Sequence, residues 1–382
     1  MKKNNLLAHI IGSTSRTLLA LTFLFSGFVK CIDPLGTVYK IEDYLKAFGG
    51  WCNDLLPYAG IAAVCLIALE FLLGVCLLTN VRTKWTSWIT LAFMLVMTPL
   101  TLWIALTNPV SDCGCFGDAL VLTNWQTFYK NVVLMVLVIM LLCCQKAIPQ
   151  LWSWWAELII ALCGLAVAGG IMYYSYTHLP SMDFRPYKVG NHIPTLMEDE
   201  IPPKIDVFYT FQKDGHEQEF VYAERPDLQG DSSWTFVKQE TRVLEEGKEP
   251  TIHDFEILQG EYNEELGEYL WINDITYDIL ESEEPVALVV MYDLKKTDRK
   301  QMDKLMNIIH EYSTVYFLTG SGEDEIVKMA EELGWDEETT FSTFCVADPV
   351  TLKTIVRANP GLVVIQNGTV MEKKNFRQVE FN

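Results

Sequence analysis

The sequence predicts a membrane-embedded α-helical bundle followed by a soluble α/β domain. Half of the 382 residues are hydrophobic, yet the formal net charge is −20, and these two properties lie in different halves of the chain. Residues 1–179 hold 10 Lys and Arg against 8 Asp and Glu, a net charge of +2, whereas residues 180–382 hold 19 against 41, a net charge of −22. An apolar half followed by an acidic half is typical of a membrane domain joined to a soluble one. We expect no nucleic-acid partner, because no basic face remains in so acidic a chain.

Five apolar stretches in the first half are long enough to cross a lipid bilayer, whose hydrocarbon core of about 30 Å needs roughly 20 helical residues. The predicted spans are residues 13–31, 58–79, 87–107, 127–145 and 155–176. The first is the weakest, because Arg16 shortens its apolar length. A cleaved signal peptide is the alternative there, but no small-residue cleavage site follows the apolar run.

The short connections between spans predict how the bundle is oriented, because Lys and Arg are retained on the cytoplasmic side. Basic residues precede span one and lie after spans two and four: Lys2, Lys3, Arg16, Arg82, Lys84 and Lys146. The opposite connections carry acidic residues: Asp33, Glu42, Asp43, Asp54, Asp112 and Asp118. We therefore expect a multi-pass protein of the cytoplasmic (inner) membrane, with a cytoplasmic N-terminus and a periplasmic C-terminal domain.

From residue 178 onward the pattern becomes that of a soluble domain. A Pro-rich linker over 178–205 precedes a strand-rich extension over 206–283, and after residue 284 strands alternate with helices. The predicted strands are 286–292, 314–318, 342–346, 362–366 and 369–373, and the predicted helices are 298–312, 323–333 and 350–357. The last two strands flank Asn367-Gly368, a strong hairpin signal. Alternating elements followed by an antiparallel hairpin predict an α/β layer fold.

Cys113 and Cys115 are the leading candidates for chemistry. They flank Gly114 in the connection after span three, on the predicted outer side. Two Cys at this spacing can approach bonding distance, since Gly permits backbone angles that other residues resist. A disulfide in so tight a ring is expected to be strained and easily reduced, which suits thiol exchange. The alternatives are thiols with a structural role or a metal site; we expect no metal, because zinc needs four ligands and no His lies in the adjoining loops.

Cys31 and Cys52 form a candidate second redox pair. Both lie on the same predicted side as Cys113 and Cys115, so four accessible thiols would permit a relay from an outside partner to a second pair. A static Cys31–Cys52 disulfide that joins the two segments is an equal alternative.

Glu70 lies deep in the second span, and ionisable groups at such depth usually face the bundle interior with a partner. Arg16 starts the first span near the same end, whereas Lys30 lies roughly 21 Å further outward. We therefore expect an intramembrane Arg16–Glu70 charge pair, with a proton-relay role for Glu70 as the alternative.

These residues resemble the DoxX/MauE family of small redox-associated membrane proteins over about residues 10–145. The matching features are Arg16, Phe23, Ser26-Gly27, Lys30, Asp33-Pro34, Glu70 and the Cys-Gly-Cys-Phe-Gly signature at 113–117. The resemblance implies a four-helix membrane domain within residues 1–150, with 151–177 as a fifth transmembrane helix. Family members are associated with thiol redox work in the cell envelope: MauE proteins with disulfide maturation of methylamine dehydrogenase, DoxX-type proteins with sulfur or quinone-linked oxidoreductases. A quinone is therefore a candidate electron acceptor, and we carry over the chemistry without the pathway.

Residues 284–382 resemble a thioredoxin fold. The run 358–374 is similar to the cis-proline strand and hairpin of that fold, which places Pro360 at the cis-Pro position. Thioredoxins carry Cys-x-x-Cys after the strand that corresponds to 286–292, but this chain has Asp293-Leu294-Lys295-Lys296 there, and Cys345 is expected in the core. The resemblance implies a domain without thiol chemistry that docks on a partner or covers a site, while its cis-Pro surface can still hold an extended peptide.

Together these observations predict a membrane thiol–disulfide redox component. Cys113 and Cys115 would exchange electrons with a periplasmic thiol protein, with a quinone as a further candidate acceptor. The alternative is a non-catalytic, membrane-anchored scaffold whose acidic domain docks an envelope partner. A transporter is disfavoured, because the five spans show neither equal halves nor paired broken helices.

Overall fold

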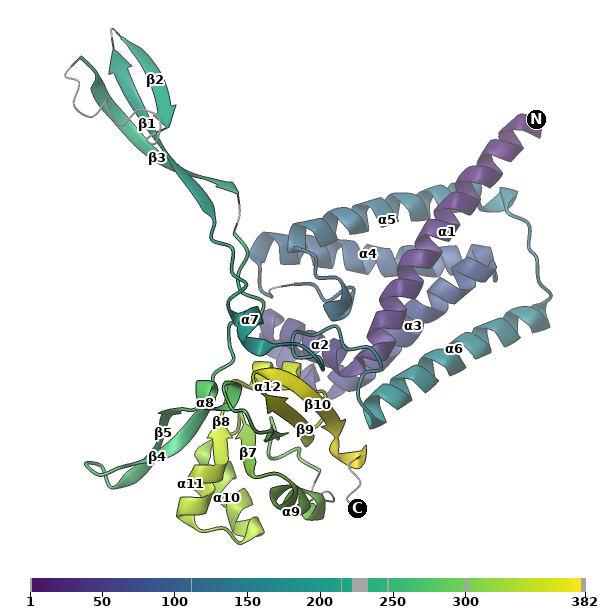
Figure 1. The fold of residues 1–382 in the computed structure, drawn as a ribbon. Helices are drawn as coiled ribbons and strands as arrows, with labels where there is room; N and C mark the ends of the chain where they lie inside the picture. Colours follow the sequence, from purple (N-terminus) through teal and green to yellow (C-terminus); the bar gives the residue numbers. More distant parts are fainter. Residues whose placement is uncertain are drawn as a thin grey trace.

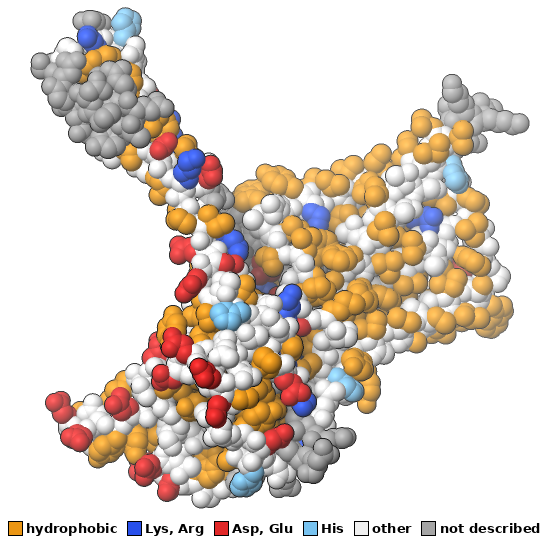
Figure 2. All heavy atoms as spheres, viewed as in Figure 1, with side chains coloured by type: hydrophobic (Ala, Val, Ile, Leu, Met, Phe, Trp, Pro, Cys, Tyr) orange, Lys and Arg blue, Asp and Glu red, His pale blue; other side chains and the backbone are white. Residues whose placement is uncertain are grey.

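The computed structural model describes residues 2–110, 112–213, 215–221, 233–245, 247–298, 300 and 302–378. A bundle of long helices carries an α/β domain at one end, and a separate β-sheet arm projects away from both (Figure 1). Within the described residues, five helical segments are long and apolar enough to cross a membrane: Leu6–Ile32, Gly50–Thr79, Thr83–Thr107, Asn124–Ala147 and Trp154–Thr177. Apolar side chains cover the outside of the bundle, whereas acidic ones gather on the α/β domain (Figure 2). The five predicted spans are confirmed, and the protein is a multi-pass membrane protein.

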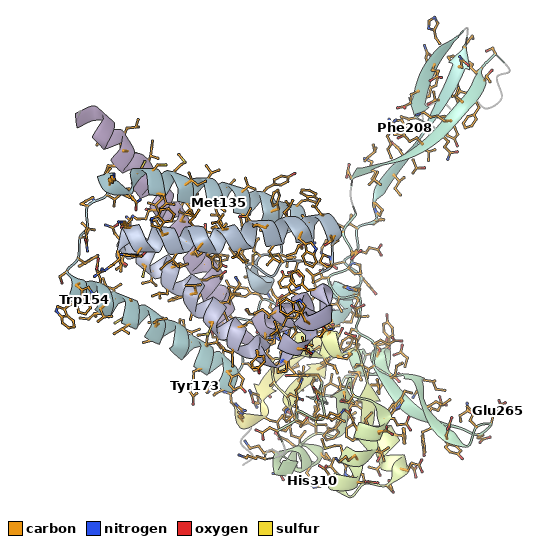
Figure 3. The ribbon with its side chains drawn as sticks, turned by 180° about the vertical axis from the view of Figure 1, so that it is seen from behind. Met135, Trp154, Tyr173, Phe208, Glu265 and His310 are labelled. Carbon is orange, nitrogen blue, oxygen red and sulfur yellow. The ribbon has the colours of Figure 1, made fainter. Side chains whose placement is uncertain are left out.

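Close backbone contact between the first two long helices organises the bundle. The membrane helices are α1 (Lys2–Ile32), α3 (Ala59–Thr79), α4 (Thr83–Thr107), α5 (Asn124–Cys144) and α6 (Trp154–Thr177). A Cβ on Gly27 would lie 2.7 Å from the Phe71 backbone, and a Cβ on Gly74 would lie 2.6 Å from the Leu24 nitrogen. Small residues therefore let α1 and α3 pack tightly, as is common between membrane helices. In Figure 3, Trp154 marks the end of α6 far from the α/β domain.

The segment between the first two spans is helical, although we expected a loop. It contains α2 (Pro34–Phe48) and the 3₁₀-helix η1 (Gly50–Tyr58). Asp33 caps α2 by accepting a hydrogen bond from the Gly36 backbone N–H, and Pro34 occupies the first helical position, where its missing N–H costs nothing. Helix α2 lies at the end of the bundle that faces the α/β domain (Figure 1).

The α/β domain has a central sheet with helices on both faces. Among the described strands, the order is β10-β9-β6-β7-β8-β4-β5; β6, β7 and β8 are parallel, and β9 and β10 form the predicted hairpin. The strands are β4 (Leu258–Asn263), β5 (Glu268–Asp274), β6 (Val286–Val290), β7 (Thr314–Thr319), β8 (Phe344–Val346), β9 (Gly361–Gln366) and β10 (Thr369–Asn375). The peptide bond before Pro360 is cis. The predicted mixed α/β character of this half is confirmed.

Two apolar cores hold the helices on the sheet. One face packs against α7 (Ile193–Met197), α8 (Thr276–Leu280) and α12 (Pro349–Ile355) through Ile193, Ile279 and Leu352. The other packs against α9 (Met302–Glu311) and α10 (Glu323–Leu333) through Ile308 and Met329. The predicted helices correspond to α9, α10 and α12, although residues 299 and 301 of the expected 298–312 helix lie outside the described residues. The short α11 (Glu337–Thr343) before β8 was not predicted.

The expected domain boundary at 283/284 is wrong. Strand β4 pairs with β8, so the β4–β5 hairpin extends the sheet of the α/β domain. Among the described strands, the separate sheet consists of β1 (Lys204–Lys213), β2 (His216–Val221) and β3 (Thr235–Glu245), in the order β2-β1-β3, and forms the projecting arm in Figure 1. The expected linker is also packed in part, because Tyr187 and Ile193 are buried in the core of the α/β domain.

Candidate functional site

Cys113 and Cys115 lie side by side in the connection between α4 and α5. Both are free thiols, their sulfur atoms are 2.6 Å apart, and they are 7 % and 9 % exposed. The turn depends on Gly114, whose φ of +64° lies in the left-handed region that favours glycine. The Gly114 N–H donates to Asp112 Oδ1 at 2.7 Å, and this hydrogen bond from a residue to one two positions earlier fixes the turn. The local backbone therefore brings the two sulfur atoms together.

Side chains from α1 and α2 hold this Cys loop in place. The Tyr44 hydroxyl donates to the Cys113 carbonyl oxygen at 2.6 Å, and the Ser26 hydroxyl lies 2.7 Å from the Cys115 carbonyl oxygen. Lys40 of α2 forms an ion pair with Asp112, with 2.8 Å between nitrogen and oxygen. The Cys loop is thus anchored to the end of the bundle that faces the α/β domain.

A buried polar network lies directly behind Cys115. Lys30 Nζ is 2.6 Å from Glu70 Oε2, and the two side chains are only 6 % and 5 % exposed. Lys30 also donates to Ser26 Oγ at 2.9 Å, and Ser26 Oγ lies 3.0 Å from the same Glu70 oxygen. Because the Ser26 hydroxyl also reaches the Cys115 carbonyl, the network connects α1, α3 and the Cys loop.

The expected Arg16–Glu70 charge pair is wrong. The close approach of α1 and α3 at Gly27 sets Glu70 beside the last turn of α1, where Lys30 is its partner. Arg16 instead donates to carbonyl oxygens at the C-terminal end of α3, including that of Leu78 at 3.0 Å. A cation is favoured there, because the last carbonyl groups of a helix have no partners within it and carry partial negative charge.

The two thiols differ in how readily they ionise. The hydrogen bond between the two thiols lowers the pKa of Cys115 to about 6; burial opposes this shift, and the ammonium groups of Lys130 and Lys30 add to it. The same hydrogen bond, together with burial, raises the pKa of Cys113 above its ordinary value. Because the thiolate is the nucleophile in thiol chemistry, Cys115 is the thiol better prepared to attack.

A cavity of about 400 Å³ lies against the Cys loop and is walled by both halves of the protein. From the bundle it is lined by Lys30, Asp33, Thr37, Lys40, Tyr44, Cys113 and Cys115, and from the rest of the chain by Asp183, Arg185, Lys353, Thr354 and Arg357. We call it the interdomain cavity. A cavity of about 30 Å³, here called the bundle cavity, lies among Ser26, Glu70, Phe93, Lys130 and Asn131. Cys115 lines both cavities.

The α/β domain is fixed over the Cys loop by buried polar contacts. Arg357, two residues after α12, is 7 % exposed and forms ion pairs with Asp33 at 2.9 Å and Asp118 at 3.4 Å. The Tyr39 hydroxyl of α2 donates to that of Tyr292, which follows β6, at 3.0 Å. The domain therefore rests on α2 and on the residues that follow the Cys loop.

The other predicted site residues lie apart from this centre. Cys31 is fully buried in an apolar cluster with Ile67, Phe71, Ala168 and Met172. Cys52 lies in η1, both thiols are free, and no contact between their sulfur atoms is found among the described residues. Pro360 lines a separate cavity of about 430 Å³, also lined by Tyr292, Lys296, Asn359 and Arg357. Cys345 is completely buried in β8.

The sequence indicated Ser26 only through the family resemblance, Lys30 was considered as a partner of Glu70 and set aside in favour of Arg16, and no contacts were predicted for Tyr44 or Arg357. The spacing of four residues between Ser26 and Lys30 places them on one face of a helix, which could have indicated the network. Tyr44 carried no such signal, because α2 was not predicted. Arg357 meets Asp33 across 324 residues, and no local pattern reports such a contact.

Comparison with known proteins supports the membrane half of this description. Residues 8–144 match the family model described as Methylamine utilisation protein MauE. The match covers α1 to α5 with the Cys loop, which is just over a third of the chain. No curated protein and no solved structure shows significant similarity to the chain. The membrane domain over residues 8–144 is therefore similar to MauE, a family of membrane proteins.

Proposed function

We propose that the protein is a membrane thiol–disulfide redox component of the cell envelope, in which Cys113 and Cys115 exchange electrons with a periplasmic thiol protein. The observation that carries this proposal is the pair of free thiols, 2.6 Å apart, that lines the interdomain cavity. The match of residues 8–144 to MauE supports a redox-associated role in the membrane.

The exchange uses the different ionisation of the two thiols. The Cys115 thiolate attacks one sulfur of the partner's disulfide; a mixed disulfide forms, and the first partner thiolate leaves. Cys113 then attacks the Cys115 sulfur, which forms the Cys113–Cys115 disulfide and releases the second partner thiolate. Two electrons pass to the partner, and its thiolates take up the two protons that the Cys pair loses. The same steps run in reverse when the partner is oxidised.

The charge distribution supports a periplasmic location for this chemistry. The opposite end of the bundle carries Arg82 between α3 and α4, Lys84 in the first turn of α4, and Lys146 between α5 and α6. Basic connections are retained in the cytoplasm, so the end with the Cys loop would face the periplasm of an inner membrane. Disulfide chemistry persists in that oxidising compartment.

We further propose that the α/β domain is a thioredoxin-like lid without thiol chemistry of its own. The order β10-β9-β6-β7, with β6 parallel to β7 and antiparallel to β9, supports the resemblance. The connection after β6 has no Cys, and Cys345 is buried. Arg357 and Tyr292 instead attach this domain to the bundle beside the Cys loop.

A quinone finds little support in the site. The bundle cavity has apolar walls from Phe23, Phe93 and Met94, as a quinone ring would require, but its volume of about 30 Å³ suits only one or two water molecules. The interdomain cavity is larger, but its walls carry the ion pairs of Arg357 and Lys40. We therefore derive no step through a quinone, and this acceptor stays a prediction.

Thiol trapping in membranes tests the proposed exchange. Cys113→Ser keeps the attacking Cys115 but removes the thiol that resolves the mixed disulfide, so we expect this variant to accumulate mixed disulfides. Cys115→Ser should accumulate fewer, and the double variant should accumulate none at this site. The wild-type pair should also change between dithiol and disulfide as the ratio of reduced to oxidised dithiothreitol is varied. Thiols that stay unchanged throughout that range would contradict the proposal.

The second candidate is a membrane-anchored scaffold, favoured by the absence of Cys after β6 and by the acidic surface of the α/β domain. Its docked partner would be an envelope protein. The two functions are separated by a cellular phenotype that depends on the protein. If Cys113→Ser/Cys115→Ser keeps full function while removal of residues 200–382 abolishes it, the scaffold is the correct function. If the double Cys variant loses function, the redox proposal is supported.

A further inference from the structure

The thiol exchange proposed above leaves the Lys30–Glu70 ion pair without a role. Both side chains are almost fully buried near the end of the bundle, beside Ser26. Removing two charges from water costs several kcal/mol per ion, and apolar residues of similar volume are often as stable in their place. Ionisable groups within membrane helices commonly mark proton or ion pathways. A buried pair next to a reactive thiol therefore calls for a chemical explanation.

The network joins the two cavities that meet at Cys115. Lys30 lines the interdomain cavity, whereas Ser26 and Glu70 line the bundle cavity, and Lys30 contacts both of these side chains directly. The bundle cavity, at about 30 Å³, is large enough for a water molecule and offers it polar partners. Ser26 contacts the Cys115 carbonyl oxygen and not its sulfur, so a proton from the Cys115 thiol would reach Glu70 through a water molecule in the bundle cavity and the Ser26 hydroxyl.

We propose that Ser26, Lys30 and Glu70 form a proton store for Cys115, in which Glu70 takes the thiol proton as the nucleophile forms and returns it later in the exchange. This inference rests on the proposed thiol exchange and adds a proton acceptor to it. Ser26 passes the proton, since a hydroxyl both accepts and donates, and Lys30 positions the Glu70 carboxylate.

The charge balance of the step favours this assignment. Below the pKa of Cys115, about 6, the buried set starts with an ammonium, a carboxylate and a neutral thiol; after the step, it holds an ammonium, a carboxylic acid and a thiolate. The net charge stays zero, so the buried site avoids the cost of an uncompensated ion. When Cys113 later displaces the partner, the stored proton leaves with the released partner thiolate.

Several charged and titratable groups surround the Cys pair. Among the described residues they include Lys30 from α1, Lys40 and Tyr44 from α2, Glu70 from α3, Lys130 from α5 and Asp112 within the loop. Lys130 lies over the Phe116 ring, 4.2 Å from its centroid. Among these groups, Glu70 is the carboxylate that shares a cavity with Cys115 and is hydrogen-bonded to a hydroxyl that contacts the Cys loop.

The test follows the oxidation of the reduced Cys pair by 4,4′-dithiodipyridine in the full-length protein in nanodiscs. The dithiol reduces one reagent molecule to two thiopyridones. Their absorbance, after subtraction of the signal that the other Cys give in Cys113→Ser/Cys115→Ser, reports the rate between pH 5 and 9.5. We expect Lys30→Met/Glu70→Gln, which removes the pair without leaving an unpaired charge, to react about tenfold more slowly at pH 6 and at the wild-type rate above pH 9. Ser26→Ala keeps the ion pair and removes only the hydroxyl, and we expect the same displacement of the pH profile with a smaller amplitude.

The chain offers a matched control at the far end of the bundle. Glu157 is buried and forms an ion pair with Arg82, whose side chain is 42 % exposed, at 2.9 Å, so Arg82→Met/Glu157→Gln removes an ion pair of the bundle away from the thiols. This control should keep the wild-type pH profile. Wild-type profiles in both Ser26→Ala and the Lys30/Glu70 variant would overturn the inference, and if the Lys30/Glu70 variant does not fold, Ser26→Ala alone decides. A wild-type pair that never reacts would overturn the proposed exchange itself.

Discussion

Arg357 Nε lies 2.9 Å from Asp33 Oδ2, although 324 residues separate them in the sequence. Asp33 caps α2 in the membrane domain, and Arg357 belongs to the α/β domain, so one contact joins the two halves beside the Cys loop. Burial alone would raise the pKa of Asp33, but the guanidinium groups of Arg357 and Arg185 outweigh burial and hold it below its ordinary value. The ion pair therefore holds the α/β domain over the thiols.

Reversing the charge of Arg357 should release the α/β domain from the bundle. Arg357→Glu leaves Asp33 and Asp118 facing a third carboxylate, and breaking a buried ion pair typically costs about 3–5 kcal/mol. We expect a 5-kDa polyethylene glycol maleimide to label Cys113 and Cys115 at least several-fold faster, while N-ethylmaleimide labelling changes little. Arg242→Glu in the β-sheet arm is the control, because its side chain is 41 % exposed and its ion pairs are with Glu219 and Glu240 of the same sheet. Equal slow labelling of both variants by the large reagent would show that the ion pair does not hold the domain.

The two thiols should titrate in different pH ranges. Because the pKa of Cys115 is lowered to about 6, its thiolate persists as the pH falls from 8.5 and is lost below about 6. Iodoacetamide should therefore modify Cys115 in Cys113→Ser, where a hydroxyl can still donate, with a midpoint well below that of Cys113 in Cys115→Ser. Mass spectrometry of the alkylated peptides between pH 5 and 9.5 gives both midpoints. Indistinguishable midpoints would contradict the proposed attacking role of Cys115.

Gly114→Ala should disturb the Cys pair. Its φ of +64° disfavours other residues, and an added Cβ would lie 2.9 Å from Lys40 Cγ. The left-handed conformation alone costs roughly 1–2 kcal/mol, so we expect the turn to open and oxidation to the disulfide to slow. Gly169→Ala in α6 is the control, since nothing lies within 4 Å of its added Cβ. Unchanged oxidation in Gly114→Ala would show that the turn tolerates a side chain.

Lys373 should make the α/β domain more stable as the pH rises. Burial and the nearby Arg185 lower the pKa of Lys373 to about 8, although Asp183 opposes this shift. Between pH 8 and the ordinary lysine pKa, the unfolded chain holds a proton that the folded protein has released, so this residue adds stability with increasing pH. The melting temperature of wild type relative to Lys373→Met should therefore rise between pH 8 and 10. A constant difference would contradict the lowered pKa.

Cys31 and Cys52 should be dispensable for oxidation of the Cys pair. Cys31 is enclosed by apolar side chains, and Cys52 lies in η1 without a sulfur contact to it among the described residues. The Cys31→Ala/Cys52→Ala variant should react with 4,4′-dithiodipyridine at Cys113 and Cys115 at the wild-type rate. A loss of oxidation, or a Cys31–Cys52 disulfide found by peptide mapping, would instead support the relay.

The sequence predicted the elements whose signals are local. Long apolar runs located the membrane helices, and the pattern from 286 to 373 located β6 to β10 within a few residues. Helix α2 was missed, because its apolar residues are interrupted by charges such as Lys40 and Glu42, which a search for membrane spans reads as a loop. The pairing of β4 with β8 spans more than 80 residues, and only tertiary structure reveals it.

In the candidate functional site, too, the sequence predicted local features but not contacts between distant residues. Cys113 and Cys115 are two residues apart, so spacing alone brought them together, and their sulfur atoms are neighbours in the structure. The partner of Glu70 depended on where α1 and α3 cross, which the close approach at Gly27 decides, and depth along the membrane was too coarse to choose between Arg16 and Lys30. Contacts between helices therefore have to be located before charges can be paired.

The interdomain cavity has walls from two parts of the chain, and this has a consequence for access to the thiols. The walls on the bundle side belong to the region similar to MauE. The opposite walls come from the linker and the segment around α12, outside that similarity. A protein with only the walls on the bundle side would leave its thiols open to any disulfide that reaches this surface. Substitutions in the walls outside that similarity should therefore change which molecules reach Cys113 and Cys115, while the walls on the bundle side stay the same.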